Sequence, residues 1–171
     1  MRNLLPESVV SYSKHLELFV RATGKHSPTR FLDYGGNSRA YANWLAQHGE
    51  CSISIPDATQ ALKTRSFHGV HLKDGLEQAN DLNSVFAHVA YLLVEGGVVM
   101  TTFRDFSFEE DNQRTRSGLP SITPESITQT CHVNGISISL VGRWVPNYHV
   151  AEDKPQATPY HVLLGTLTVP A

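Results

Sequence analysis

The segment Val98–Phe103 is apolar or β-branched at every position, and it constrains the fold more than any other feature of the chain. Apolar side chains follow one another here instead of alternating with polar ones, which is typical of a strand buried on both faces in a parallel sheet. Helix-type spacing of apolar residues precedes this segment over Leu82–Val94 and follows it after Thr123. Because helix and strand patterns alternate along the chain, the sequence predicts an α/β domain with a mainly parallel sheet.

Glycines and capping residues delimit the predicted elements. Thr123 and Pro124 are suited to the start of a helix, and Gly24, Gly49 and the Glu95–Gly97 segment are suited to helix ends. The predicted helices span residues 8–23, 38–48, 58–64, 82–94 and 123–134, and the predicted strands span residues 30–33, 51–55, 67–72, 98–103, 136–144 and 160–169.

The strand pattern also predicts an arrangement. No helix lies between the last two predicted strands, so we expect them to be antiparallel neighbours at one edge of the sheet, with the final strand running against its neighbours. The strand Arg30–Asp33 stops at a glycine pair, and we expect it to lie inside the sheet beside Val98–Phe103.

Length and composition indicate one domain. The 171 residues predict a single unit made of an N-terminal helix (1–29), a core (30–105), an exposed loop (106–120) and a C-terminal helix with strands (121–171). The formal net charge of −2 gives no basic footprint for nucleic acid, and no apolar run approaches the roughly 20 residues of a membrane span. Cys51 and Cys131 have no metal or redox spacing, so we expect buried thiols and a cytoplasmic protein.

Four segments of the chain, taken in order, resemble the class I S-adenosylmethionine-dependent methyltransferases. Residues 30–38 (RFLDYGGNS) resemble the family's first strand and glycine-rich turn, in a variant similar to enzymes that methylate sugars and natural products. Residues 74–82 (DGLEQANDL) are similar to the motif after the fourth strand, and residues 92–99 (LLVEGGVV) to the turn before the fifth strand. Residues 122–136 resemble the later helix and the strand after it.

This resemblance implies a Rossmann-like methyltransferase fold, S-adenosylmethionine as cofactor, and methyl transfer to a small polar acceptor. The implied cofactor-binding residues are Asp33, Gly35, Gly36, Asn37 and Asp57, with Asp57 near the ribose. Glycine allows the backbone to approach a ligand closely, which is the physical reason for a glycine turn at such a site.

An oxygen or nitrogen acceptor can also require a general base. His71, Asp74 and Glu77 lie at or beyond a predicted strand end, where an α/β sheet has its crevice, and are the candidates. The alternative is a solvated turn with no catalytic role. His68 and His71 have no third ligand nearby, so we expect no metal site.

Two positions and one shortened segment depart from the family pattern. Arg39 occupies the place of the last turn glycine, and Pro56 occupies that of the ribose acid, with Asp57 one residue later. Only nine residues separate Asp57 from Phe67, so we expect fewer strands than the family's usual seven and a homodimer or partner covering the trimmed edge.

These departures keep three functions open: a methyltransferase, a catalytically silent module that binds a partner, and a protein that binds another ligand in the same crevice. Arg39 can fold back onto Asp33 and obstruct the cofactor site, or it can point outward and leave the turn usable. At the positive end of a helix dipole, Arg39 needs an acid, a bound anion or exposure to water, and Asp33 and Asp57 are the nearby acids. Because the ribose acid is also displaced, we favour the obstructed arrangement.

Overall fold

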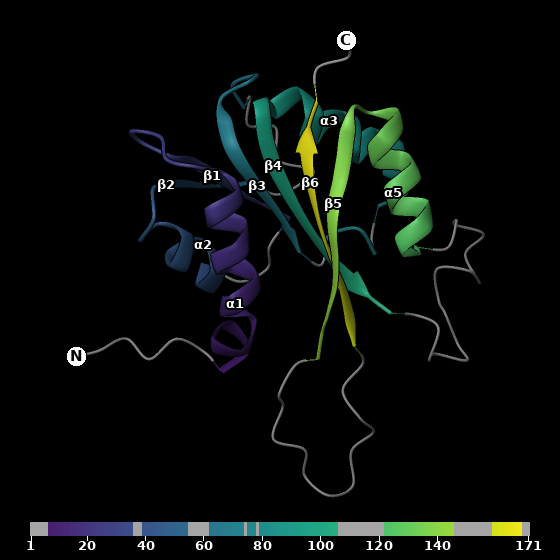
Figure 1. Cartoon of the computed structure of the whole chain (residues 1–171), viewed down its shortest axis with the longest axis horizontal. Helices are drawn as coiled ribbons and strands as arrows, with labels where there is room; N and C mark the ends of the chain where they lie inside the picture. The colour runs from purple at the N-terminus through teal and green to yellow at the C-terminus, as the bar shows by residue number, and fades with distance from the viewer. Residues whose placement is uncertain are drawn as a thin grey trace, which may run out of the picture.

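A mixed, mostly parallel sheet forms the centre of the molecule (Figure 1). The computed structural model describes residues 7–35, 39–54, 62–73, 75–77, 79–105, 122–145 and 159–168. In this part of the chain the strands are β1 (Arg30–Tyr34), β2 (Glu50–Ser54), β3 (Phe67–Lys73), β4 (Leu93–Arg104), β5 (Ile136–Trp144) and β6 (Tyr160–Leu167). Their order in the six-stranded sheet is β2-β1-β3-β4-β6-β5.

The strand directions agree with the predicted fold class. β2, β1, β3 and β4 are parallel neighbours, and β6 runs antiparallel between β4 and β5. The described sheet has six strands, and it ends at β2 on the side of the shortened segment. The expectation of fewer than seven strands stays a prediction, because residues 55–61 lie outside the described residues.

One expectation about the strand order is wrong. β1 is an inner strand, but it does not lie beside Val98–Phe103, because β3 is inserted between β1 and β4. Most of β3 is buried, and its residues pair with β1 on one side and β4 on the other. Apolar continuity in β1 and β4 shows that both are inner strands, but it carries no information on which strand lies next to which.

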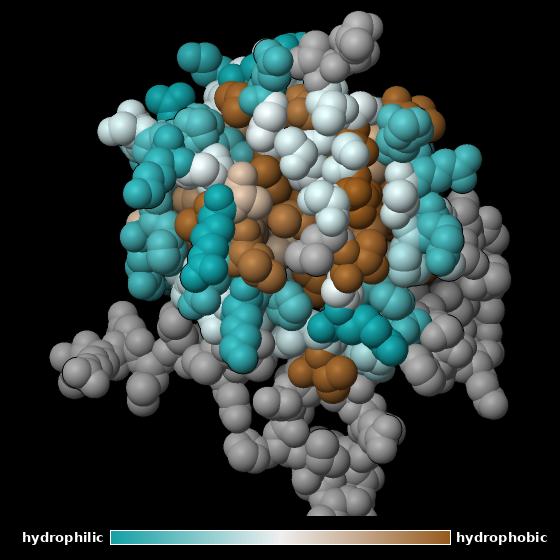
Figure 2. Space-filling view, in the orientation of Figure 1, coloured by the Kyte–Doolittle hydropathy of each residue, from teal (hydrophilic) through white to brown (hydrophobic). Residues whose placement is uncertain are grey.

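Helices cover both faces of the sheet. They are α1 (Glu7–Ala22), α2 (Arg39–Leu45), α3 (Leu82–Leu92) and α5 (Pro124–Val133). α1 and α2 pack on the face that carries Phe31, whereas α3 and α5 pack on the face that carries Leu32, as strand alternation requires. Apolar surface (brown in Figure 2) is visible between α1 and α5, where no helix covers the sheet, and hydrophilic side chains predominate around it.

Helix ends follow the predicted caps in two places and differ in two others. Thr123 forms a capping box with Ser126 at the start of α5, and Asp81 caps α3. The Glu95–Gly97 segment lies inside β4, at an irregular pairing with β3, because the strand begins directly after α3. α2 ends at Leu45, short of the predicted end. The predicted helix 58–64 is not helical over residues 62–64, and its other residues, like the loop 106–120, lie outside the described residues.

The His68 ring, at the opposite end of β3 from the predicted crevice, makes stability depend on pH. Its Nδ1 accepts a hydrogen bond from the Arg30 N–H at 2.9 Å, and its ring stacks on His26 at 3.8 Å. Burial lowers the pKa of His68, and the nearby His26 and Arg30 lower it further. The unfolded chain therefore takes up a proton at a higher pH than the folded chain does.

We expect the free energy of unfolding to fall as the pH drops below about 6.5, the ordinary pKa of histidine. In His68→Asn, the amide oxygen can accept the same hydrogen bond without titrating, so this fall becomes smaller. Urea unfolding at about pH 7 and about pH 5.5 measures it. His48→Asn, on an exposed residue after α2, is the control. If the free energy of unfolding fell equally between the two pH values in the native protein and in His68→Asn, His68 would not be the source of this pH dependence.

Candidate functional site

Two turns meet at the ends of β1 and β3. Gly35 follows β1 with φ of +79°, a backbone conformation that favours glycine, and its N–H donates to the Ser54 carbonyl at 2.7 Å. A Cβ placed on Gly75, after β3, would lie 3.1 Å from the Leu72 side chain and 3.8 Å from the Gly35 Cα. The two turns therefore pack against each other at the carboxyl edge of the parallel strands, where α/β folds have their ligand crevice.

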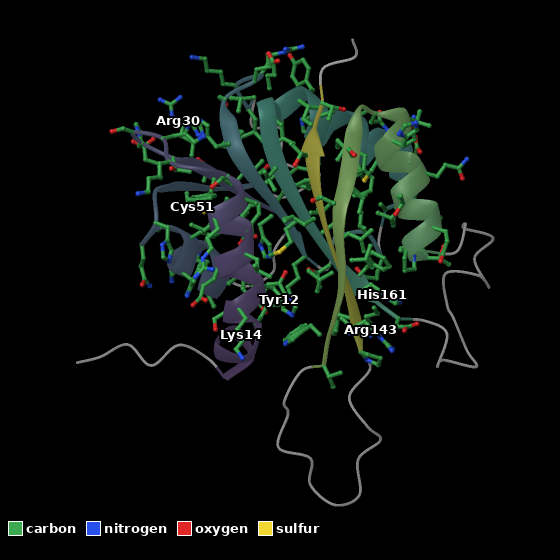
Figure 3. The ribbon with its side chains drawn as sticks, viewed as in Figure 1. Tyr12, Lys14, Arg30, Cys51, Arg143 and His161 are labelled. Carbon is green, nitrogen blue, oxygen red and sulfur yellow. The ribbon has the colours of Figure 1, made fainter. Side chains whose placement is uncertain are left out.

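A buried polar network lies directly behind this edge. Asp33 and His71 are register partners on β1 and β3, and His71 Nδ1 lies 3.0 Å from Asp33 Oδ1. The hydroxyl of Tyr12, on α1, lies 3.1 Å from His71 Nε2 and 2.6 Å from Thr102 Oγ1 on β4. All four residues are at most 1% exposed. The network joins one helix to three strands, and Tyr12 faces the sheet in Figure 3.

Hydrogen-bonding capacity fixes the direction of this network. An ionised Asp33 only accepts, so His71 Nδ1 carries a proton and donates to it. Nε2 of a neutral His71 then accepts from the Tyr12 hydroxyl, and Thr102 donates to the Tyr12 oxygen. The second oxygen of Asp33, Oδ2, is buried and has no hydrogen-bond partner among the described residues.

Lys73 ends β3 among aromatic rings. Its ammonium nitrogen lies 5.3 Å from the ring centre of Tyr41, 5.5 Å from that of Trp144 and 5.1 Å from that of Tyr160. Lys73 is only 7% exposed, so these cation–π contacts operate away from bulk water. The lysine thereby draws α2, β5 and β6 together over the end of β3.

A second charged cluster lies at the ends of β4, β5 and β6. Asp105 Oδ2 accepts from Arg143 Nη2 at 2.9 Å and from His161 Nε2 at 3.1 Å. The side chain of Asp105 is 9% exposed, that of His161 16% and that of Arg143 54%. His161 therefore has a carboxylate on one ring nitrogen and retains access to solvent. Figure 3 shows Arg143 and His161 close together at the lower end of the sheet.

The structure brings together part of the predicted site. Asp33, Gly35 and His71 lie together at the ends of β1 and β3, and Glu77 lies beyond β3, where its Oε1 accepts from the Arg104 N–H at 3.1 Å. His71 is fully buried and bonded through both ring nitrogens. The remaining predicted residues lie outside the described residues: Gly36, Asn37, Asp57 and Asp74.

The favoured arrangement of Arg39 is wrong. Arg39 is the first residue of α2 and is exposed, and the described part of the chain has no ion pair between it and Asp33. Asp33 is paired instead with His71. The carboxylate expected to attract the guanidinium already has a closer partner on the neighbouring strand.

Sequence patterns alone did not single out Tyr12 or Lys73. Asp105 follows the predicted strand Val98–Phe103, and its place in the sequence leaves two interpretations open: a residue of the crevice, or a surface ion pair with Arg104. One sequence signal could have identified Lys73: a lysine ends a mostly apolar strand. A lysine buried in that position needs partners for its ammonium group, because burial removes its contact with water.

The two thiols are poor nucleophiles at neutral pH. Burial, together with the negative charge of Asp33, raises the pKa of Cys51 to about 12, and burial raises the pKa of Cys131 to about 12. The described ranges hold no group of three metal-ligating side chains. No helix in the same ranges is long and apolar enough to span a membrane.

Comparisons with known proteins identify the fold. An S-adenosylmethionine-dependent methyltransferase from Mesorhizobium loti matches with a TM-score of 0.64 and 14% identity, over 94% of this chain and 100% of that one. The Haemonchus contortus phosphoethanolamine N-methyltransferase 2, complexed with phosphomonomethylethanolamine and S-adenosylhomocysteine, matches with a TM-score of 0.65 and 11% identity, over 95% of this chain and 56% of that one.

The [4+2]-cyclase SpnF matches with a TM-score of 0.67 and 13% identity, over 92% of this chain and 81% of that one. No protein-family model and no curated protein matches the sequence. The chain has the Rossmann-like fold of the class I S-adenosylmethionine-dependent methyltransferases.

Removing the Tyr12 hydroxyl tests the buried network. We expect Tyr12→Phe to lower the free energy of unfolding by about 1–3 kcal/mol, because His71 Nε2 loses its donor in a buried site. The combined loss in Tyr12→Phe with Thr102→Val should be smaller than the sum of the single losses, since both changes break one hydrogen bond. Urea unfolding measures all three variants. Tyr91→Phe, at an exposed ring, is the matched control, and a loss as large there would argue against the network.

Proposed function

We propose that the protein binds S-adenosylmethionine and transfers its methyl group to a small polar acceptor. The observation that carries this proposal is Oδ2 of Asp33, which is buried two residues before Gly35 and has no hydrogen-bond partner among the described residues. A buried carboxylate oxygen without a donor fits the ammonium group at the amino-acid end of such a cofactor. The tight approach of Gly75 to the Gly35 turn supports the same crevice.

The cofactor supplies an electrophilic methyl group on a sulfonium, and the protein residues hold and orient the reactants. Asp33 would accept a hydrogen bond from the ligand ammonium, and Gly35 would form the turn beneath it. His71 holds the Asp33 carboxylate in place and is too enclosed to reach an acceptor. By resemblance, Gly36, Asn37 and Asp57 would complete the cofactor site.

Deprotonation of the acceptor needs an accessible base, and His161 is a further candidate beside Asp74 and Glu77. His161 Nε2 donates to Asp105, which leaves Nδ1 to accept a proton. This histidine is the second residue of β6 and pairs with Phe103 near the end of β4. The arrangement follows the general logic of a histidine oriented by a buried carboxylate.

A second candidate function is a module that keeps the fold and binds a ligand or partner without methyl transfer. The described sheet ends at β2, so the strand that usually follows it is missing from the described residues. The likeness to a protein named a cyclase supports the view that this fold serves other chemistry.

Calorimetric titration with S-adenosylhomocysteine tests the cofactor site that the proposed methyl transfer requires. We expect the native protein to bind it, and Asp33→Asn to bind about tenfold more weakly, because one charge-assisted hydrogen bond is lost. Arg39→Gly should leave the affinity nearly unchanged, since this side chain is exposed. Asp81→Asn, which retains a helix cap, is the control. The thermal midpoint of each variant shows whether it is folded, and absence of binding to the folded native chain would favour the silent module.

A further inference from the structure

The outer edge of β5 is poorly protected for an exposed strand. β5 has nine residues and pairs with β6, and no described strand pairs with its other side. Its sequence ISISLVGRW contains no proline and no charge before Arg143. One register shift, between Ile138 and Leu140, is the protective irregularity in this strand. Edges in natural proteins usually carry charges or proline, or are covered, because their free backbone groups recruit other strands.

A groove runs between this edge and α5. Its volume is about 670 Å³, and it is lined on the helix side by Glu125, Gln129 and His132 and on the strand side by Ser137, Ile138 and Val141. Val141 is 56% exposed. The groove thus combines a strand edge that no described strand pairs with, an exposed apolar side chain and a flanking helix, which is the geometry for adding a strand to the sheet.

A carboxylate and an imidazole lie at opposite ends of the groove, one a hydrogen-bond acceptor and the other able to donate. Glu125 lies in the first turn of α5 and His132 in the last turn, and both line the groove. If a second copy approaches with its β5 antiparallel to this one, its α5 also runs antiparallel. Glu125 of one copy then faces His132 of the other, twice in one interface, as two-fold symmetry requires.

We propose that this surface, made by β5 and α5, is a homodimer interface in which two copies pair their β5 strands antiparallel and form one continuous sheet. A second copy matches both the backbone edge that no described strand pairs with and the acceptor and donor at the two ends of the groove. An unrelated extended peptide would match the backbone alone. The proposal does not depend on the proposed methyl transfer.

The other edge of the sheet is the alternative place for a dimer. β2 has five residues, and its Glu50 is paired with Arg30 at 3.5 Å. Ile53 on this strand is 40% exposed. The expectation of a partner at this trimmed edge stays a prediction. The two edges carry comparable exposed apolar residues, so they can be compared directly.

Sedimentation of the full chain over a range of concentrations tests the proposal. The native protein should dimerise, and Val141→Lys should raise the dissociation constant at least about tenfold, because a lysine is introduced twice into one symmetric interface. The matched variant Ile53→Lys should dimerise like the native protein. Both positions are exposed, and thermal unfolding verifies that each variant is folded.

A charge exchange tests the antiparallel arrangement. Glu125→Lys alone should weaken the dimer, and Glu125→Lys combined with His132→Glu should restore it. A native protein that is monomeric at every concentration would overturn the proposal. Dissociation by Ile53→Lys but not by Val141→Lys would also overturn it and would place the interface at β2. Failure of the exchange to restore the dimer would overturn the proposed antiparallel pairing.

Discussion

The carboxylate of Asp33 is buried inside the sheet, and a buried charge requires a partner. His71 provides it from the adjacent strand, Tyr12 holds His71 from α1, and Thr102 holds Tyr12 from β4. Each group depends on the next one for its hydrogen bonds. The position of α1 on the sheet is therefore coupled to the position of the carboxylate beside the Gly35 turn. Loss of one member leaves buried polar atoms unsatisfied, which is more costly than the net contribution of any single bond.

The buried hydrogen-bond network also determines how Asp33 is presented at the edge of the sheet. A carboxylate fixed by a buried histidine is held in one orientation without contact from a ligand, so the ligand does not have to order it. Lys73 has a corresponding role at the end of β3, where three aromatic rings restrain its ammonium group. The cluster around Asp105 is more open, because Arg143 and His161 retain contact with solvent. The carboxyl edge of the sheet is thus enclosed and restrained at the ends of β1 and β3, and accessible to solvent at the end of β4.

Local patterns in the sequence predicted most of the elements. Apolar runs located the strands, and Thr123 with Pro124 located the start of α5. The buried network was not predictable in this way, because it joins residues from α1, β1, β3 and β4 whose proximity depends on strand order and register. The error over Arg39 has the same origin. Local electrostatics suggested Asp33 as its partner, and only the register of β1 with β3 shows that His71 is closer to Asp33.

The antiparallel β6, inserted between β4 and β5, has a consequence for the order of folding during synthesis. β5 leaves the ribosome before β6, yet in the described sheet it is attached to the other strands through β6 alone. Until β6 is translated, β5 has no neighbour, and β4 lacks the strand on one of its sides. The parallel strands β1 to β4 can assemble earlier from segments already made. Among the described strands, β6 therefore completes the sheet, and a nascent chain that stalls before it would expose one edge of β4 and the whole of the unpaired β5 to chaperones or to aggregation.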